Sequence, residues 1–459
     1  MTKVNRNTLP IRNSSLEQLL TASAHILSQL ELKHGSLRAL VYASEEPQKT
    51  KLLKITCDCL KYRIVLDLII QRSGIMKLNQ FSDISRDLVR VCLQQYLFGS
   101  CRRTKAALKH MFASVQDEIK VILEQLICAG TLNSKGFLPN EILPQQSTDI
   151  PRYARVNSCR ASFDEVVNEL DGIGLKRKMF KKNLRKSKAF RNAVAELKQF
   201  EFFADPHLHG LLVFHPKARL TQLRAYKQGR LILQDKSSCL ATNALMPPPD
   251  SIVLDACAAP GLKASHLAAL MNNTGQLLLV DRDYTRVEVM CSFIESYGVK
   301  NAQVKLGDIL KEDFSNGREY SAVTHCLLDV PCSGSGTVAK RLDYLVPDGN
   351  DSDNLKGSGR IKTLANLQAM MLKHSLRNLP SLERLVYSTC SVYDEENEAV
   401  VEEALNDSWI CDRFKLDSEA IAGWKRRGRL EFECGASCFR TDPKRDLMNG
   451  FFVAVFQRI

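Results

Sequence analysis

Two cysteines in this sequence stand in short turns of small and polar residues, directly after strand-like segments. Cys332 lies in segment 329–336 and Cys390 lies in segment 387–391. A cysteine that only fills a core is typically a small apolar side chain within an apolar run, which neither of these is. The thiolate is the nucleophilic form of cysteine, and a free thiol with a pKa near ~8.5 is only slightly ionised at neutral pH. The pattern therefore predicts covalent chemistry by an activated thiol.

Thiolate addition is the chemistry that methylation of a pyrimidine ring carbon needs. Carbon 5 of cytosine is a poor nucleophile, but a thiolate that adds at carbon 6 turns carbon 5 into an enamine carbon able to attack a sulfonium methyl group. Loss of the carbon 5 proton then eliminates the thiol. An acid or hydrogen-bond donor is needed on the N3 side of the ring, and Asp329, shortly before Cys332, is the candidate. The target base has to leave any stack to reach such a pocket.

The elements expected to position these cysteines are parallel strands. Strand-like and helix-like segments alternate from about residue 231, which predicts an α/β fold with a doubly wound, mostly parallel sheet. With strand order 3-2-1-4-5, the fourth and fifth strands are neighbours, so both cysteines emerge at one carboxyl edge. The expected strands are 251–254, 276–280, 303–306, 323–328 and 384–388, with helices through 266–271, 287–297 and 364–378 and a last strand, 451–455, as an antiparallel edge.

A loop of small residues follows the first expected strand and is the candidate cofactor site. A ligand of such a sheet binds outside the carboxyl ends of the strands, and small residues with a glycine allow close approach of the backbone. Asp281, at the end of the second strand, suits ribose hydroxyls, and Asp308, after the third, suits an adenine edge. The loop itself consists of Asp255, Ala256, Cys257, Ala258, Ala259, Pro260, Gly261, Leu262 and Lys263.

The composition of this loop favours S-adenosylmethionine over a dinucleotide. A pyrophosphate site uses G-x-G-x-x-G, whereas this loop has one glycine, preceded by Pro260. S-adenosylmethionine has no phosphate, and its sulfonium cation suits the carboxylates Asp255, Asp281 and Asp308. An acid after a strand also commonly caps the following helix, and that alternative stays open for each of them.

Overall charge and one basic run point to a polyanionic partner. The chain has 64 Lys and Arg against 51 Asp and Glu, a formal net charge of +13. Within 176–191 there are nine cations and no acid, with Phe180 and Phe190 interleaved. Two interpretations remain: a solvated face over two core phenylalanines, or a surface that follows phosphates. We prefer the second, with RNA contacts from Lys178, Lys181, Lys182, Arg185 and Lys186.

The remaining sequence predicts the domain organisation. Apolar residues recur at helical spacing from residue 16 to about 132, and the N-terminal residues look like no export signal. The 15 cysteines are therefore expected to be reduced, and neither Cys57 with Cys59 nor Cys434 with Cys438 makes a convincing metal site. The polar segment 343–359 reads as a mobile loop. We expect a helical domain at 1–138, a linker at 139–150, a small α+β RNA-binding subdomain at 151–228 and a Rossmann-like methyltransferase domain at 229–459.

At these motifs the chain resembles the Nop/Sun-domain family of RNA cytosine-5 methyltransferases. The resemblance covers about 151–459, with Leu262 in place of the commoner Gly or Asn and an enlarged 343–359 loop as departures. Besides the cofactor loop and the two cysteine motifs, it rests on Pro151-Arg152 with Arg155-Val156-Asn157, on Gln234-Asp235, on Glu395-Glu396-Asn397-Glu398 and on Gly450-Phe451-Phe452-Val453.

The resemblance implies roles for individual residues. Cys390 would be the attacking thiolate and Cys332 would assist product release, whereas bacterial-type DNA methyltransferases attack with the Pro-Cys cysteine; the pair thus favours RNA as substrate. Asp329 would lie against the base. Cofactor contacts would come from Cys257, Ala258, Ala259, Pro260, Gly261, Leu262, Lys263, Asp281, Arg286, Asp308 and Asp329.

Within the family, the chain looks most like the branch of the fifth human-type member and its yeast relative. That likeness rests on Gly35-Ser36, Leu40-Val41-Tyr42-Ala43-Ser44 and the Cys332–Gly336 stretch, and it implies methylation of large-subunit ribosomal RNA in the nucleolus. Transfer RNA as substrate, and a ribosome-assembly factor that no longer catalyses, are the alternatives. The sequence does not indicate an oligomeric state.

Overall fold

The computed structural model describes residues 14–32, 37–132, 150–180, 184–185, 187–312, 314, 318–337 and 358–459. The chain divides into two compact units: Met1–Gln146 with Ala339–Gly357, and Ser147–Val338 with Ser358–Ile459.

The first unit is helical, as the spacing of its apolar residues predicts. Its helices bury one apolar stripe each around a common core that contains Leu20, Leu66, Phe81 and Phe112. Ser85 caps one of them by accepting a hydrogen bond from the Leu88 amide. The helices are α1 (Ser14–Glu31), α2 (Leu37–Ala43), α3 (Lys49–Lys61), α4 (Arg63–Ser73), α5 (Arg86–Phe98), α6 (Arg102–Lys109) and α7 (Gln116–Cys128).

The second unit begins with a small α+β subdomain, again as expected. Its strands form a sheet in the order β2-β3-β4-β1-β5. Ser162 and Glu165 form a capping box at the start of α8, and one face of the sheet packs on that helix. The elements are β1 (Arg152–Val156), α8 (Phe163–Gly172), β2 (Lys176–Arg177), α9 (Ser187–Ala195), β3 (Glu201–Ala204), β4 (Leu211–Phe214), α10 (Arg224–Lys227) and β5 (Leu231–Leu233).

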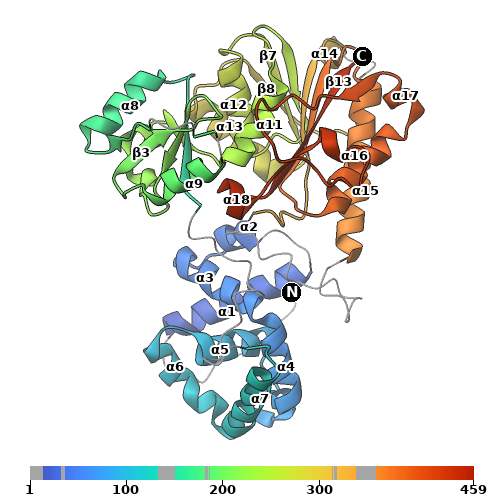
Figure 1. Ribbon diagram of the computed structural model, residues 1–459. Helices are drawn as coiled ribbons and strands as arrows, with labels where there is room; N and C mark the ends of the chain where they lie inside the picture. The colour runs from blue at the N-terminus through green and yellow to red at the C-terminus, as the bar shows by residue number, and fades with distance from the viewer. Residues whose placement is uncertain are drawn as a thin grey trace. The chain divides into compact units, whose positions relative to one another are not determined.

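The larger sheet follows the predicted order: β8, β7, β6, β9 and β10 are neighbours in this order, and all of them pair in parallel. Its strands β7 and β8 lie side by side in Figure 1. The expected antiparallel edge is wrong in one respect: β13 is antiparallel but lies between β10 and β11, so β11 forms that edge. The strands are β6 (Ile252–Asp255), β7 (Gln276–Asp281), β8 (Ala302–Leu306), β9 (His325–Asp329), β10 (Arg384–Thr389), β11 (Phe414–Leu416), β12 (Phe439–Thr441) and β13 (Phe451–Arg458).

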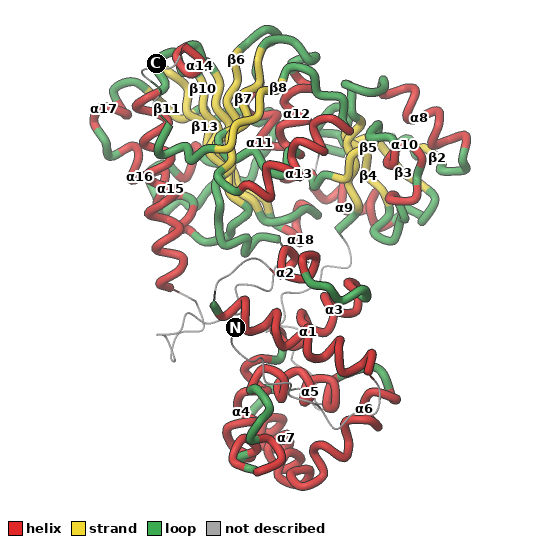
Figure 2. The backbone as a smooth tube through the Cα atoms, turned by 180° about the vertical axis from the view of Figure 1, so that it is seen from behind, coloured by secondary structure: helices red, strands yellow, loops and turns green. Residues whose placement is uncertain are grey.

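Helices cover both faces of this sheet, as in a doubly wound fold. In Figure 2, α11, α12 and α13 lie over one face. The other face packs against α14, α15, α16 and α17. The helices are α11 (Lys236–Leu245), α12 (Leu262–Leu270), α13 (Tyr284–Ser296), α14 (Arg318–Ser321), α15 (Ser358–Asn378), α16 (Glu398–Leu405), α17 (Ser408–Cys411) and α18 (Pro443–Asp446).

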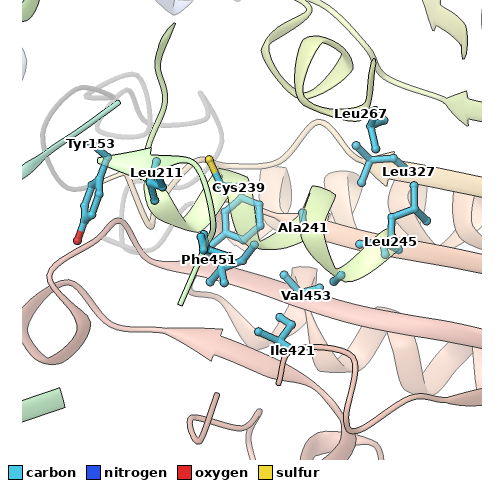
Figure 3. Packing of buried hydrophobic residues seen from close by; sticks show 14 of the residues in the cluster. Tyr153, Leu211, Cys239, Ala241, Leu245, Leu267, Leu327, Ile421, Phe451 and Val453 are labelled. Atoms are coloured by element: carbon cyan, nitrogen blue, oxygen red, sulfur yellow. The ribbon is translucent and has the colours of Figure 1, made fainter. Parts of the chain in front are cut away.

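The small subdomain and the large sheet share one hydrophobic core. Tyr153 and Leu211 of the small sheet belong to the same cluster as Cys239 and Leu245 of α11 and Val453 of β13 (Figure 3). The two parts belong to the same compact unit. Each Å² of apolar surface that they bury against each other stabilises this unit by roughly 25 cal/mol.

The predicted loop at 343–359 and the predicted linker at 139–150 fall mostly outside the described residues. Residues 343–357 of the predicted loop and most of the predicted linker lie outside the described residues, whereas Ser358 and Gly359 begin α15. In the part of the chain that is described, no helix has both the length and the apolar character that crossing a bilayer requires.

Candidate active site

The two cysteines meet at the carboxyl edge of the sheet. Strands β9 and β10 pair in parallel with Ser388 opposite Asp329, so the turns that follow them are neighbours. The Sγ atoms of Cys332 and Cys390 lie 3.1 Å apart. The Gly336 amide donates to the Cys390 carbonyl at 2.9 Å, which joins the two turns directly. The predicted convergence of the two thiols is therefore present.

The two thiols differ in their surroundings. Cys332 is buried, whereas Cys390 is half-buried. The hydrogen bond with Cys390, then burial, then the charges of Cys390, Glu396 and Asp329 raise the pKa of the Cys332 thiol well above its usual value. Cys332 is thus the sulfur that keeps its proton, and it can donate an S–H hydrogen bond to Cys390.

Lys263 and Asp329 form an ion pair beside these sulfurs. Lys263 Nζ donates to Asp329 Oδ2 at 2.7 Å, and Ser388 Oγ donates to Asp329 Oδ1 at 2.7 Å. Burial disfavours the ammonium, but the charge and hydrogen bond of Asp329, with a smaller contribution from Cys390, raise the pKa of Lys263 above its usual value. Both carboxylate oxygens of Asp329 therefore accept hydrogen bonds, one from a positive donor and one from a neutral donor.

Asp281 holds the candidate cofactor loop, residues 255–263, at the end of β7. Asp281 Oδ2 accepts from the Ala259 amide at 3.1 Å, and Oδ1 accepts from the Asp283 amide at 3.1 Å. Arg286 lies 3.4 Å from Asp281 and also donates to the Ala259 carbonyl. Gly261 has φ +99°, and a Cβ there would meet Met290 Cγ at 3.2 Å, so the turn into α12 needs a glycine.

The surroundings of Asp255 indicate whether these residues suit a cofactor with a sulfonium cation. Its side chain is 1% exposed, and neither carboxylate oxygen has a well-formed hydrogen bond to any described residue. Burial, followed by the charge of Asp329, raises the pKa of Asp255 to about 7, against smaller opposing effects of Lys263 and the Cys257 amide. A buried carboxylate without a well-placed donor is costly unless a positive group meets it. A cation next to Asp255, Asp281 and Asp329 would meet this need, so the donor set fits S-adenosylmethionine.

The other predicted cofactor residues lie on the same loop or on the next strand end. Cys257, Ala258, Pro260 and Leu262 lie with Ala259 between β6 and the start of α12. Asp308 follows β8, half-buried, and its Oδ1 accepts from the Leu310 amide at 3.2 Å. Asp308 therefore caps its own turn with one oxygen, and its predicted contact to the cofactor stays a prediction.

The basic run is only partly described. Lys181, Lys182 and Lys186 lie outside the described residues. Lys178 pairs with Glu196 at 3.8 Å, and Arg185 donates to the Pro206 carbonyl at 3.1 Å. Phe190 is buried, and Phe180 packs edge-on against Phe203 with ring centroids 5.2 Å apart. Phe190 is thus a core residue and Phe180 packs, partly buried, against the same core, while the RNA contacts of the run stay a prediction.

Sequence reasoning missed the residues that fasten the two cysteine turns. Glu396 accepts from the Ser333 amide at 2.8 Å and from Ser333 Oγ at 2.5 Å. Asn397 accepts from Thr389 Oγ1 at 2.5 Å and donates to the Ser391 carbonyl at 3.1 Å. In the sequence, the block 395–398 stands out only as part of the family pattern. The feature that could have indicated this role is the position of two adjacent polar residues, Glu396 and Asn397, shortly after Cys390.

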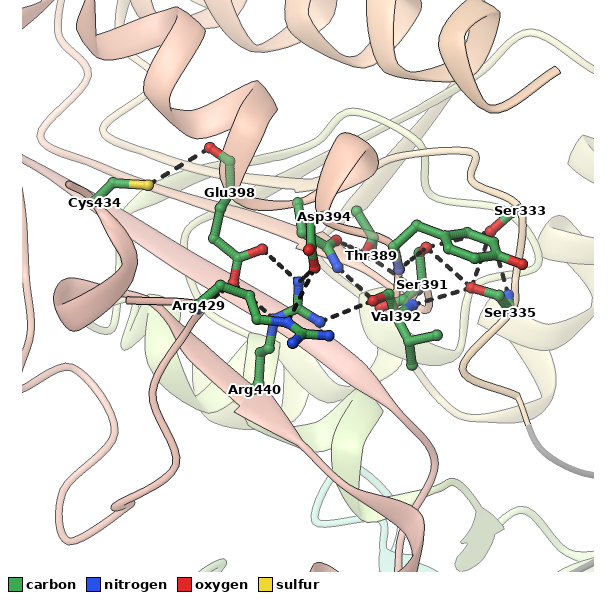
Figure 4. A network of polar contacts seen from close by, with 12 residues as sticks. Ser333, Ser335, Thr389, Ser391, Val392, Asp394, Glu398, Arg429, Cys434 and Arg440 are labelled. Carbon is green, nitrogen blue, oxygen red and sulfur yellow. Dashed lines mark hydrogen bonds and ion pairs between the residues drawn. The ribbon is translucent and has the colours of Figure 1, made fainter. Parts of the chain in front are cut away.

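A polar network extends outward from these turns (Figure 4). Ser335 Oγ lies 3.1 Å from Ser391 Oγ and accepts from the Val392 amide at 3.0 Å. Arg440 donates to the Val392 carbonyl at 3.0 Å and pairs with both Asp394 and buried Glu398. Within the described ranges, no three His, Cys, Asp or Glu side chains gather as metal ligands would.

Two family descriptions match the chain, one over each part of the second unit. The family described as 16S rRNA methyltransferase RsmB/F matches residues 242–457. The ferredoxin-like domain of NOL1/NOP2/Sun domain family member 5 matches residues 150–234.

Curated relatives match nearly the whole chain. The 26S rRNA (cytosine-C(5))-methyltransferase nsun-5 of Caenorhabditis elegans is 36% identical, covering 96% of this chain and 98% of its own. The 28S rRNA (cytosine-C(5))-methyltransferase of Mus musculus is 35% identical, with coverages of 96% and 91%. The 25S rRNA (cytosine-C(5))-methyltransferase rcm1 of Schizosaccharomyces pombe is 30% identical, with coverages of 94% and 89%.

Solved structures share the fold. The crystal structure of PH0851 has a TM-score of 0.61 at 22% identity and covers 95% of this chain and 98% of its own. A methyltransferase homolog protein from Pyrococcus horikoshii has a TM-score of 0.51 at 25% identity, with coverages of 70% and 91%. The predicted Rossmann-like class with a small subdomain and a helical N-terminal region is confirmed.

Proposed function

The chain belongs to the NOL1/NOP2/Sun domain family of RNA methyltransferases, and from this premise we propose that it methylates carbon 5 of a cytosine in large-subunit ribosomal RNA. The relatives that match nearly the whole chain act on 25S, 26S or 28S rRNA. The observation that carries the proposal is the pair of sulfurs 3.1 Å apart beside the Lys263–Asp329 ion pair. A nucleolar site of action follows from this substrate.

Cys390 is the attacking thiolate in this proposal. It is the more exposed of the two sulfurs and has the Lys263 ammonium in its electrostatic surroundings, which favours the negative form. Its sulfur adds to carbon 6, and the electron pair of the C5–C6 double bond becomes available at carbon 5. The Lys263–Asp329 pair lies against the N3 side of the ring, where charge develops.

S-adenosylmethionine supplies the electrophilic methyl group for carbon 5. Residues 257–263, Asp281, Arg286 and Asp308 would hold it, with the Asp255 carboxylate available to its positive charge. Release then needs the carbon 5 proton to pass to solvent, while the C5–H electron pair restores the double bond. The bond between carbon 6 and the Cys390 sulfur breaks, and its electron pair returns to the sulfur. Cys332 donates its S–H hydrogen bond to that departing thiolate.

The RNA would enter through the small subdomain. We assign residues 151–228 to RNA binding and 229–459 to methyl transfer, with contacts from Lys178, Lys181, Lys182, Arg185 and Lys186. The +13 net charge of the chain supports a polyanionic partner.

The deciding experiment is the trapping of a covalent complex. The full chain is incubated with S-adenosylmethionine and with large-subunit rRNA that contains 5-azacytidine but carries no methylated cytosine. Transfer RNA is the comparison. We expect a denaturation-resistant adduct with ribosomal RNA that Cys390→Ala abolishes, and an adduct on ordinary RNA that builds up in Cys332→Ala. Full methylation by Cys390→Ala would refute the assigned nucleophile, and a preference for transfer RNA would refute the assigned substrate.

A further inference from the structure

The turns that carry the two cysteines are each fastened by a different member of one dipeptide. Glu396 ends the 3₁₀ turn Asp394–Glu396, and Asn397 precedes α16. Both side chains are fully buried. Of the two cysteine turns, Glu396 bonds to that of Cys332, through Ser333, whereas Asn397 bonds to residues on both sides of Cys390.

Glu396 also accepts hydrogen bonds from the neutral side chains of Gln368 and Tyr387. Gln368 Nε2 donates to Glu396 Oε1 at 3.1 Å and to the Pro331 carbonyl at 2.9 Å, so it joins the carboxylate to the residue before Cys332. Tyr387 Oη donates to the Glu396 carbonyl at 2.6 Å and fixes the backbone. Among the described residues Glu396 forms no ion pair, and the donors that its carboxylate meets there are neutral.

We propose that Glu396 and Asn397 form a positioning clamp that sets the separation of the two sulfurs and keeps Cys332 as the thiol that donates to the departing Cys390 sulfur. The inference rests on the proposed function. Neither residue touches the substrate; each acts through the turn that it holds. Glu396 serves the release step, because it holds Cys332, and Asn397 serves the attack step, because it holds Cys390.

The charged and titratable groups around Cys332 support the first assignment. They are Cys390 and Tyr387 from β10 and its turn, Asp329 from β9 and Glu396, with Lys263 of α12 paired to Asp329. The hydrogen bond with Cys390 and burial contribute most to the raised pKa of Cys332, and Glu396 contributes in the same direction. Without that negative charge the pKa of Cys332 falls, and the S–H donor is lost at a lower pH.

The test separates attack from release in the full chain. Adduct formation and decay are followed in single turnovers with methyl-labelled S-adenosylmethionine and unmodified large-subunit rRNA. In Glu396→Gln we expect the adduct to decay about tenfold more slowly, the size of one lost hydrogen bond, and we expect the loss of decay rate at high pH to begin at a lower pH than in the parent chain. In Asn397→Asp, which keeps the acceptor and loses the donor, we expect slower formation with decay unchanged.

Glu395→Gln is the matched control, since Glu395 lies in the same 3₁₀ turn but is exposed. It should form and release the adduct as the parent chain does. If Glu396→Gln does not fold, Ser333→Ala decides instead, because it removes the 2.5 Å bond and leaves the backbone bond. Decay at the parent rate at every pH, in whichever of these variants folds, overturns the clamp. Absence of both methyl transfer and any adduct in the parent chain overturns the proposed function itself.

Discussion

Lys263 Nζ lies 2.7 Å from Asp329 Oδ2, and the same ammonium interacts electrostatically with the sulfur of Cys390. One side chain of α12 thus links the Asp329 carboxylate to the Cys390 thiol. The pair is only slightly exposed, at 15% for Lys263 and 26% for Asp329. Electrostatic interactions are stronger in such surroundings than in water.

Replacing Lys263 by Met should therefore lower the rate of methyl transfer. The change keeps most of the volume of the side chain and removes its charge, so Asp329 loses its partner and the Cys390 thiolate loses its cation. We expect the single-turnover methylation rate to fall by roughly 10²- to 10³-fold, the range of a lost acid–base or charge-stabilising group. Lys300→Met, at an exposed position after α13, is the control and should methylate at the parent rate. A Lys263→Met variant as fast as that control would remove Lys263 from the mechanism.

Asp255 gives a prediction for stability against pH. Burial raises the pKa of Asp255 from 3.8 to about 7, so the folded chain binds this proton more tightly than the unfolded chain. The associated stability is present below about pH 4 and is lost as pH rises towards 7, by at most about 1.4 kcal/mol per pH unit. Asp255→Asn carries no charge and should escape this loss.

The measurement is urea denaturation of both proteins without cofactor between pH 5 and 8. The free energy of unfolding of Asp255→Asn should exceed that of the parent by an amount that grows with pH. Added S-adenosylmethionine should reduce this difference in the free energy of unfolding at pH 8. Its cation stabilises the ionised carboxylate, which the parent has and the variant lacks. A gap that is constant over this range would mean that Asp255 does not titrate there.

Arg155 should hold the small subdomain on α12. It is 2% exposed, and its guanidinium donates to Gln234 at 2.8 Å and to Ser265 of α12 at 2.9 Å. Lysine keeps the charge but lacks the planar fork that reaches both acceptors. We expect Arg155→Lys to lower the free energy of unfolding by about 1–3 kcal/mol. Arg152→Lys, at an exposed position on the same strand, should cost much less, and equal losses in the two variants would show that the buried bonds add nothing.

Some elements can be predicted from the sequence alone, because the periodicity of their apolar residues and the residues at their ends indicate the same structure. The order of the five parallel strands follows from the alternation of strands and helices, and the meeting of Cys332 with Cys390 follows from that order. The position of β13 did not follow, because β11 (Phe414–Leu416) is too short to stand out as a strand. Gln368 could not be found either, since only the packing of α15 brings its amide to Pro331.

The poor hydrogen bonding of Asp255 is likewise visible only in three dimensions. An acid at the end of a strand reads equally as a helix cap, and Asp308 does cap its own turn with one oxygen. Asp281 uses both oxygens to hold backbone amides, whereas Asp255 has no well-formed hydrogen bond to a described residue. Three acids with similar positions in the sequence thus have three different local roles.

The basic run offers a prediction about RNA that leaves the chemistry untouched. Reversing the charges of Lys181, Lys182 and Arg185 to Glu should weaken RNA binding and flatten the plot of log affinity against log salt, by roughly 0.7 for each phosphate that the variant no longer neutralises. Arg185 also bonds to the Pro206 carbonyl, so a variant reversed only at Lys181 and Lys182 separates charge from local structure. Filter binding over a salt series measures the slope, and calorimetry should show unchanged affinity for S-adenosylmethionine. An unchanged slope in both variants would make the run a solvated surface, as the alternative interpretation has it.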